Sequence, residues 1–309
     1  MLLQVGLENT HAELGILWKW WWWKSREVRV AVRLALRCGR AILETRRVAV
    51  QWKDDAGIDP CTQTDRDNEE VVVAGLRRAF PRDAVVGEEA CSETGVIPGL
   101  GGRTWVVDPI DGTQNFVHGL PCSVVSLALC VDGSPRVGVV YDPHRNELFV
   151  AEAGKGAFLD GRRLAADAAP TKLENALVLT DPGYEREDID ALVAVYRALL
   201  ERKTRAIRVI GSSVLSLCWV AASRASAFIV GLANGDAPKP WDWAAATLIA
   251  REAGATIAAI DGRRTLSSEK KAVVGDAKFD LFSKSCVCAN DPGLAADLKR
   301  LANAATSIF

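Results

Sequence analysis

The spacing of hydrophobic residues changes along the first half of the chain. Between Glu27 and Ile42, apolar residues recur every three or four positions while arginines line another face, which predicts an amphipathic helix with a solvated basic side. A second helix is expected from about Asp65 to just before Pro81, with acidic residues in its first turn. Short apolar runs separated by turn residues follow over 84–151 and predict an antiparallel meander.

After about residue 165 the pattern of the chain becomes an alternation of strands and helices. The expected strands cover 176–180, 206–210, 227–230 and 256–260, and the expected helices cover 189–202, 212–223 and 241–254. Such alternation predicts an α/β fold, built as an α+β layered sandwich. No repeat or low-complexity linker separates the two halves, 27–165 and 166–309, so we expect them to pack as one unit with a ligand cleft at their junction.

Residues 1–26 continue neither pattern and are expected to form an extension outside the fold. This segment contains a tryptophan cluster, Trp18 and Trp20–Trp23, flanked by Lys19 and Lys24. It is too short for a stable membrane span and lacks a signal-peptide cleavage site. An interfacial anchor stays open because tryptophan favours membrane interfaces, but an extension outside the fold is the preferred interpretation.

The composition of the chain excludes several classes of function. The 309 residues carry a formal net charge of -1 and no sustained basic run, so nucleic acid is not an expected partner. Eight cysteines are scattered, mostly in apolar runs, and there are only three histidines, which favours reduced, buried thiols over a disulfide framework or a zinc site. We expect a cytoplasmic protein, with organellar targeting left open.

The hexapeptide Asp108-Pro109-Ile110-Asp111-Gly112-Thr113 carries the strongest chemical signal. An apolar strand ends at Asp108, and Pro109 fixes the backbone where the chain turns, so the carboxylates of Asp108 and Asp111 can converge. Converging carboxylates repel each other unless a cation lies between them, and Mg²⁺ prefers oxygen ligands of this kind. Gly112 lets a ligand approach the backbone, and free N–H groups at a following turn would receive an anion. The hexapeptide therefore indicates metal-assisted phosphoryl hydrolysis.

Extended through Gln114-Asn115-Phe116, this hexapeptide resembles the signature of the inositol monophosphatase family. Further motifs stand in that family's order and approximate spacing, namely Lys53, Thr62–Asp65, Gly87-Glu88-Glu89 and Trp241–Ala245. The resemblance covers roughly residues 27–300 and is carried by several separate motifs. It implies that family's αβαβα arrangement, inhibition by Li⁺ and a homodimer.

The resemblance also implies a set of metal ligands. Glu88, Asp108 and the carbonyl of Ile110 would hold a first Mg²⁺. Asp108, Asp111 and Asp242 would hold a second, so the second half of the chain supplies one ligand through Asp242. Two Mg²⁺ ions are expected, or three if the acid that activates water also contacts a metal. Glu88 is counted among the catalytic residues as well.

Catalytic and phosphate-binding roles carry over in the same way. Asp65, with Thr113, would position and deprotonate the attacking water, and Asp65 is the candidate for contact with a third ion. Gly112 and Thr113, together with Asp111, would bind the phosphate, and Gly211 and Ser212 would lie near the substrate hydroxyls. Simpler structural interpretations exist for several of these residues: Asp65, Asp242 and Ser212 as helix caps, and Glu88 as a surface acid.

The expected reaction is hydrolysis of a small-molecule phosphate monoester, inositol-1-phosphate first, by in-line attack of an activated water without a phospho-enzyme. Val230 stands where the family carries a substrate-binding glutamate, and an insertion around 234–238 includes Asp236 as a candidate replacement. Histidinol phosphate, sugar phosphates and fructose bisphosphate therefore stay open as substrates. The alternative of another class is a catalytically idle, metal-binding regulatory module.

Overall fold

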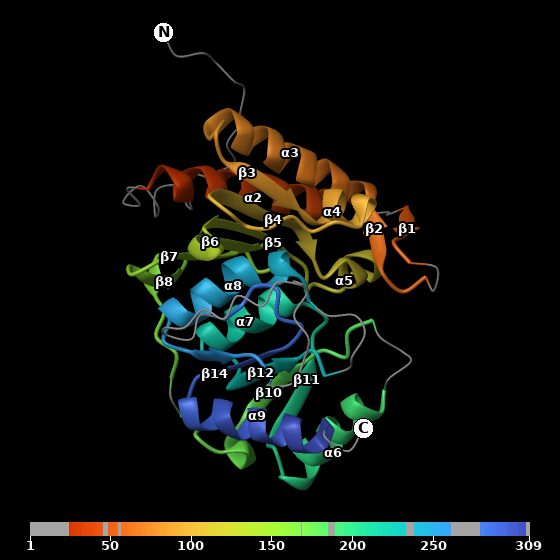
Figure 1. Ribbon diagram of the computed structural model, residues 1–309, viewed down its shortest axis with the longest axis vertical. Coiled ribbons are helices and arrows are strands. Elements are labelled where there is room, and N and C mark those ends of the chain that lie inside the picture. The colour runs from red at the N-terminus through yellow and green to blue at the C-terminus, as the bar shows by residue number, and fades with distance from the viewer. Residues whose placement is uncertain are drawn as a thin grey trace.

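Two sheets and three layers of helices alternate in the part of the chain that the computed structural model describes: residues 25–45, 49–54, 57–167, 169–184, 189–232, 238–260 and 279–306. The layers stack along the long axis in the order helix, sheet, helix, sheet, helix (Figure 1). This order confirms the expected α/β layered sandwich. The tryptophan cluster at 18–23 and the insertion residue Asp236 lie outside the described residues.

The first helical layer consists of α2 (Arg26–Glu44) and α3 (Gln63–Ala79). The hydroxyl of Ser25 accepts the backbone N–H of Val28, so α2 begins slightly before the expected position. The apolar stripe of α2 is fully buried, as its spacing predicts. A short hairpin, β1 (Val50–Trp52) and β2 (Pro60–Thr62), leads into α3.

The seven-stranded sheet lies beneath these helices and has the order β3-β4-β5-β6-β7-β8-β9. Its strands are β3 (Ala84–Gly87), β4 (Arg103–Asp111), β5 (Val124–Val131), β6 (Ser134–Asp142), β7 (Glu147–Glu152), β8 (Gly156–Leu159) and β9 (Arg162–Arg163). Strands β4 to β9 form the expected antiparallel meander. The prediction was wrong for β3, which pairs with β4 in parallel. The chain returns between them through α4 (Glu88–Thr94), and a helical return of this kind permits parallel pairing.

The second sheet has five strands in the order β11-β10-β12-β14-β13. They are β10 (Leu177–Thr180), β11 (Ala206–Val209), β12 (Ala227–Val230), β13 (Thr256–Ala258) and β14 (Cys286–Ala289). Their helices are α6 (Asp190–Glu201), α7 (Ser213–Ala221), α8 (Pro240–Glu252) and α9 (Pro292–Thr306), of which α9 was not predicted. Strands β10, β11 and β12 run parallel, so their carboxyl ends lie at one edge of the sheet.

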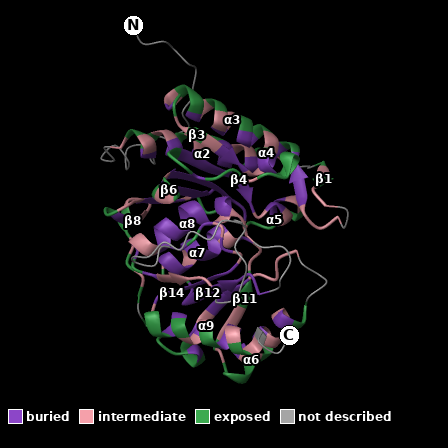
Figure 2. Ribbon diagram, in the orientation of Figure 1, coloured by how far each residue is buried: buried purple, intermediate pink, exposed green. Residues whose placement is uncertain are grey.

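Helices α7 and α8 fill the layer between the two sheets, and both are buried on nearly all sides (Figure 2). A helix that is apolar all round belongs in an interior, and α8 has this composition over Trp243–Ala250. One hydrophobic cluster joins these helices to both sheets. The middle layer thus ties the second half of the chain to the first sheet, while the division at residue 165 stays a prediction.

Two further expectations concern cysteines and membranes. Seven of the eight cysteines are buried as free thiols, and Cys122 is partly buried. Among the described residues, no helix combines the length and apolar character needed to cross a membrane.

The close contact between β6 and α8 generates a prediction about stability. A Cβ atom added at Gly138 would lie 2.7 Å from the carbonyl oxygen of Ala245, a backbone atom that cannot rotate away. We expect Gly138→Ala to lower the free energy of unfolding by about 1–3 kcal/mol, as overpacking of a core does. Gly99→Ala, where an added Cβ meets nothing within 4 Å, is the matched control. Thermal and urea denaturation measure both, and equal stability of the two variants would contradict the assigned contact.

Candidate metal and phosphate site

A cavity of about 200 Å³ opens where strand ends from both sheets meet. Asp181, Gly211 and Gly231 follow the carboxyl ends of the parallel strands β10, β11 and β12, and all three line this cavity. Glu88 and Asp108 enter it from the other sheet, because the parallel pairing of β3 and β4 sets Gly87 beside Val107. Ligands commonly bind outside the carboxyl ends of parallel strands, which makes this cavity the candidate site.

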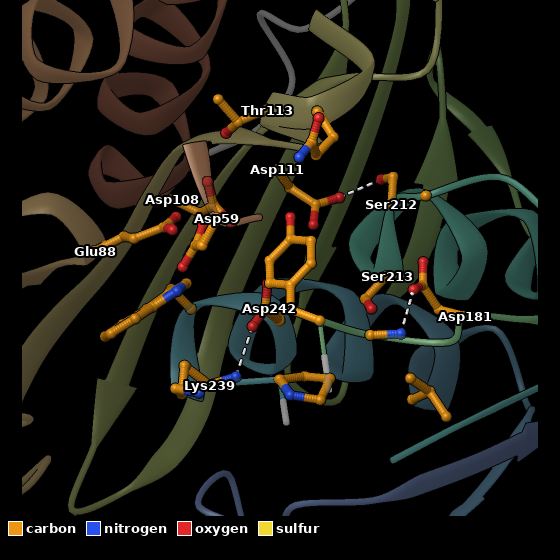
Figure 3. A pocket seen from close by; sticks show the side chains of 18 of the residues that line it. Asp59, Glu88, Asp108, Asp111, Thr113, Asp181, Ser212, Ser213, Lys239 and Asp242 are labelled. Atoms are coloured by element: carbon orange, nitrogen blue, oxygen red, sulfur yellow. Dashed lines mark hydrogen bonds between the residues drawn. The ribbon is translucent and has the colours of Figure 1, made fainter. Parts of the chain in front are cut away.

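Three carboxylates converge in the cavity. One ligand oxygen from each of Asp108, Asp111 and Asp242 lies within 4.8 Å of the others. The side chains come from opposite sides of the cavity, with Asp108 and Asp111 on β4 and Asp242 in the first turn of α8 (Figure 3). Asp108 and Asp111 pair with Ser126 and Val124 of β5, and the register shifts between them, a local irregularity of the kind that re-aims side chains next to active sites.

Burial and mutual repulsion raise the pKa of these acids. Burial, followed by the charges of Glu88, Asp111 and Asp242, raises the pKa of Asp108 well above its usual range. Burial and the charges of Asp111 and Glu88 do the same for the pKa of Asp242. Burial raises the pKa of Asp111 to about 7, although a hydrogen bond from Ser212 opposes this shift. All three acids would release their protons more readily if a cation lay among them.

Hydrogen bonds from the second half of the chain fix two of these carboxylates. Ser212 donates its hydroxyl to Asp111 Oδ2, which also accepts the backbone N–H of Val214 at 3.2 Å. The backbone N–H of Lys239 donates to Asp242 Oδ2 at 2.5 Å. Ser212 is also the N-cap of α7 and Asp242 also caps the start of α8, so their simpler interpretations hold together with a place at the site.

Asp65 lies behind the cavity wall and reaches the site through Thr113. The side chain of Asp65 is fully buried, and its Oδ1 lies 3.1 Å from the hydroxyl oxygen of Thr113. The same hydroxyl lies 2.9 Å from the carbonyl oxygen of Ile110, and Thr113 itself lines the cavity. Burial raises the pKa of Asp65 to about 6, while hydrogen bonds from Thr62 oppose the shift. Asp65 completes the capping box of α3 with Thr62, so it serves the helix and the site at once.

Glu88 lies at the edge of the acidic cluster. Its carboxylate points toward Asp108 in Figure 3, and its Oε1 accepts a hydrogen bond from Lys53 Nζ at 2.7 Å. Lys53 also donates to Glu89 Oε1 at 2.9 Å. The ammonium group of Lys53 therefore balances part of the negative charge on this side of the cavity.

Backbone groups suited to an anion lie beside the carboxylates. Gly112 and Thr113 begin the short helix α5 (Thr113–His118) and line the cavity. The side-chain amide of Asn115 donates to the carbonyls of Ile210 at 2.7 Å and Gly211 at 3.0 Å. This amide joins α5 to the loop that leads into α7, so Gly112 and Gly211 lie close together across the two halves of the chain.

Several lining residues were not predicted as site residues, among them the polar side chains of Asp59, Asp181, Tyr184 and Lys239. A signal for two of them existed in the sequence, since Asp181 and Tyr184 follow a predicted strand at Thr180. The charges of Asp59, Glu88 and Asp181 contribute, after burial, to raising the pKa of the Tyr184 phenol. Its hydroxyl therefore stays protonated and available as a hydrogen-bond donor at neutral pH.

The donor set fits a hard divalent cation. All of its side-chain ligands are carboxylate oxygens, and no cysteine or histidine belongs to the group of acids that the described residues bring together. Carboxylate oxygens are the ligands that Mg²⁺ and Ca²⁺ prefer. A bound cation would also relieve the repulsion that raises the three pKa values, so the site is suited to the metal that the sequence predicted.

Comparisons with known proteins agree on one family. A model of the inositol monophosphatase family matches residues 23–306. Inositol monophosphatase 1 of Solanum lycopersicum is 37% identical over 234 residues, covering 74% of this chain and 82% of that protein. Nus factor SuhB of Pseudomonas aeruginosa is 35% identical over 280 residues, covering 88% of this chain and 98% of that protein. The solved structure of the Thermotoga maritima IMPase matches with a TM-score of 0.73 and 29% identity over 92% of this chain and 99% of that one.

Fold, acidic site and relatives together define a phosphatase with a layered α/β architecture. The chain belongs to the inositol monophosphatase family. Members of this family depend on metal, and the acidic cluster of Asp108, Asp111 and Asp242 could bind one here.

The raised pKa values predict how pH and metal act together on stability. Asp111 has a pKa of about 7 in the folded chain against an ordinary value of 3.8, so the folded state binds more protons between these values. Stability without metal therefore falls as pH rises through this interval, whereas metal binding strengthens because it needs deprotonated carboxylates. We expect Mg²⁺ to raise the melting temperature more at about pH 8 than at about pH 5.5. An equal rise at both values, measured by calorimetry, would contradict the acidic cluster as the binding site.

Proposed function

We propose that this chain catalyses Mg²⁺-dependent hydrolysis of a phosphate monoester on a small polyol, with inositol-1-phosphate as the leading substrate. The observation that carries the proposal is the convergence of Asp108, Asp111 and Asp242 beside the Asp65–Thr113 pair. Carboxylates for a metal, a carboxylate-linked hydroxyl for water and helix-start amides for phosphate are the groups that phosphoryl hydrolysis needs.

Two groups of carboxylates would hold the metal. Asp108, Asp111 and Asp242 would share one Mg²⁺, and Asp108 would share another with Glu88 and the Ile110 carbonyl. Bound there, Mg²⁺ supplies Lewis acidity toward the phosphate and lowers the pKa of water. Glu88 has Lys53 as its present partner at 2.7 Å, so we expect this ammonium to shift when Glu88 takes a metal.

The chain's own residues would orient water and phosphate. The Thr113 hydroxyl, held between Asp65 and the Ile110 carbonyl, would accept a proton from the attacking water and pass its own proton to Asp65. A folded-state pKa of about 6 suits Asp65 for receiving a proton near neutral pH. Backbone N–H groups at Gly112 and Thr113 would hold the phosphate oxygens. Ser212, already hydrogen bonded to Asp111, would stand beside Gly211 near the substrate hydroxyls.

The proposal also concerns which alcohol carries the phosphate in the substrate. Val230 ends β12 and lines the cavity with Leu232 and Pro238, so this wall offers apolar groups where a polyol would meet a carboxylate. The relatives named inositol monophosphatase support inositol-1-phosphate. The apolar wall keeps histidinol phosphate and sugar phosphates open. The complete set of acids speaks against an idle regulatory module, because such a module has no use for a water-activating pair.

Several expectations from the family resemblance stay predictions. They are inhibition by Li⁺, a homodimer, a cytoplasmic location and a third Mg²⁺ at Asp65.

The proposed reaction is tested by phosphate release with Mg²⁺ from inositol-1-phosphate, histidinol phosphate and fructose bisphosphate. We expect the unsubstituted chain to prefer inositol-1-phosphate and Asp111→Asn to lose at least about 100-fold in kcat/KM, because this change removes a charged ligand shared with Asp108 and Asp242. Circular dichroism should show an intact fold. Near-normal turnover of Asp111→Asn would overturn the assigned metal site, and no release from any substrate would favour the regulatory module.

A substitution at Val230 tests the origin of substrate preference. We expect Val230→Glu to raise kcat/KM for inositol-1-phosphate relative to histidinol phosphate by about 10-fold, because a carboxylate there would accept substrate hydroxyls. Val230→Leu, which fills the same wall without an acceptor, is the matched control. If Val230→Glu and Val230→Leu show the same ratio of kcat/KM for inositol-1-phosphate and histidinol phosphate, this wall does not contact the alcohol part of the substrate.

A further inference from the structure

Helix α4 begins with the metal-ligand candidate Glu88, yet it has no cap of its own. Its N-cap residue, Gly87, has no side chain that could accept the free N–H groups of the first turn. Two of these groups are satisfied from another helix. The carboxylate of Glu69, on α3, accepts the backbone N–H of Glu89 at 2.8 Å and that of Ala90 at 2.9 Å.

The Glu69 carboxylate occupies the space that a side chain at position 87 would need. A Cβ atom at Gly87 would lie 2.4 Å from Glu69 Cδ and 2.5 and 2.7 Å from its two carboxylate oxygens. The backbone of Gly87, at φ -112° and ψ 151°, is open to any residue. The glycine is therefore needed for room, and any side chain there would push the Glu69 carboxylate away from the start of α4.

Glu69 also links the Asp65–Thr113 pair to the metal-ligand candidate Glu88. It lies one helical turn after Asp65 on α3, and both side chains are buried. One helix thereby holds the acid behind Thr113 and the start of the helix that presents Glu88. Both Glu69 oxygens are engaged by backbone N–H groups, and Glu69 does not belong to the acidic cluster found among the described residues.

We propose that Glu69 is a positioning residue for the metal centre, which fixes the first turn of α4 so that Glu88 stands beside Asp108. This inference rests on the proposed metal-dependent function. Residues that hold a metal ligand in place without touching the metal commonly change metal affinity about 10- to 100-fold when they are substituted. Gly87 also takes part in this positioning, because it leaves room for the Glu69 carboxylate.

The test is titration of the metal-free protein with Mg²⁺ in the absence of substrate, by calorimetry. Glu69→Gln keeps the size of the side chain but replaces one acceptor oxygen with an NH₂ group. That group faces a backbone N–H of Glu89 or Ala90, which is also a donor, so one of the two hydrogen bonds is lost. We expect Mg²⁺ to bind this variant at least about 10-fold more weakly. In assays of phosphate release, kcat at saturating Mg²⁺ should stay near that of the unsubstituted chain while the Mg²⁺ requirement rises.

Asn68→Ala is the matched control for stability. Asn68 is a buried neighbour on α3 whose amide donates to the carbonyl of Cys38 at 3.3 Å, in the outer helical layer. We expect Asn68→Ala to lower the melting temperature with no change in Mg²⁺ affinity. Unchanged Mg²⁺ affinity in Glu69→Gln, or an equal loss of affinity in Asn68→Ala, would overturn the positioning role.

A double substitution tests the contact itself. Gly87→Ala should weaken Mg²⁺ binding by displacing the Glu69 carboxylate, whereas Gly87→Ala combined with Glu69→Ala should bind Mg²⁺ as well as Glu69→Ala alone, because the clash has gone. If the losses of Mg²⁺ affinity from Gly87→Ala and Glu69→Ala add in the double variant, the proposed contact between the two residues is contradicted. Absence of Mg²⁺ binding by the unsubstituted chain would overturn the metal site itself, a result distinct from failure of the Glu69 variants.

Discussion

Repulsion between buried and partly buried carboxylates is the constraint on which the rest of this structure depends. Asp108, Asp111 and Asp242 are brought within 4.8 Å of one another, and Glu88 adds a fourth negative charge beside them. Burial makes each charge costly in an apolar interior, so the arrangement destabilises the chain until protons or a cation enter. Hydrogen bonds hold the carboxylates in place against this repulsion, from Ser212 and Val214 to Asp111 and from the Lys239 backbone to Asp242.

The layered architecture explains how such a cluster is assembled from distant parts of the sequence. Parallel pairing of β3 with β4 brings Glu88 next to Asp108, and the helix layer between the sheets carries Asp242 to the same point. Asn115 and Ser212 then lock the loop before α7 onto the α5 region. The site therefore lies at a junction, where β4 of the first sheet supplies Asp108 and Asp111 and helix α8 supplies Asp242.

Much of this architecture was predictable from the sequence, for physical reasons. Helical and strand periodicity located α2, α3 and the alternating second half, because burial of one face leaves a regular apolar pattern. The hexapeptide from Asp108 to Thr113 indicated a candidate metal site because its two carboxylates are close together in the sequence itself. The parallel return of β3 was missed, because a short helix such as α4 leaves little periodic signal and its role is set by tertiary contacts. Helix α9 was missed as well.

Residues recruited by topology were the hardest to foresee. Asp59 and Lys239 line the cavity, but nothing in their local sequence marks them as site residues. Glu69 carries no local sequence signal of its role, since its partners are backbone N–H groups on another helix. Hydrogen bonds to backbone groups leave no residue pattern that a single sequence can reveal.

The central claim, that Asp108, Asp111 and Asp242 form a divalent-metal centre, is tested most directly by a crystal structure with Mn²⁺ in place of Mg²⁺. Anomalous scattering locates the manganese independently of any assay. We predict an anomalous peak between the three carboxylates, with a second peak between Asp108 and Glu88. A map with no peak among these acids, from crystals grown at a Mn²⁺ concentration that supports phosphate release, would contradict the account.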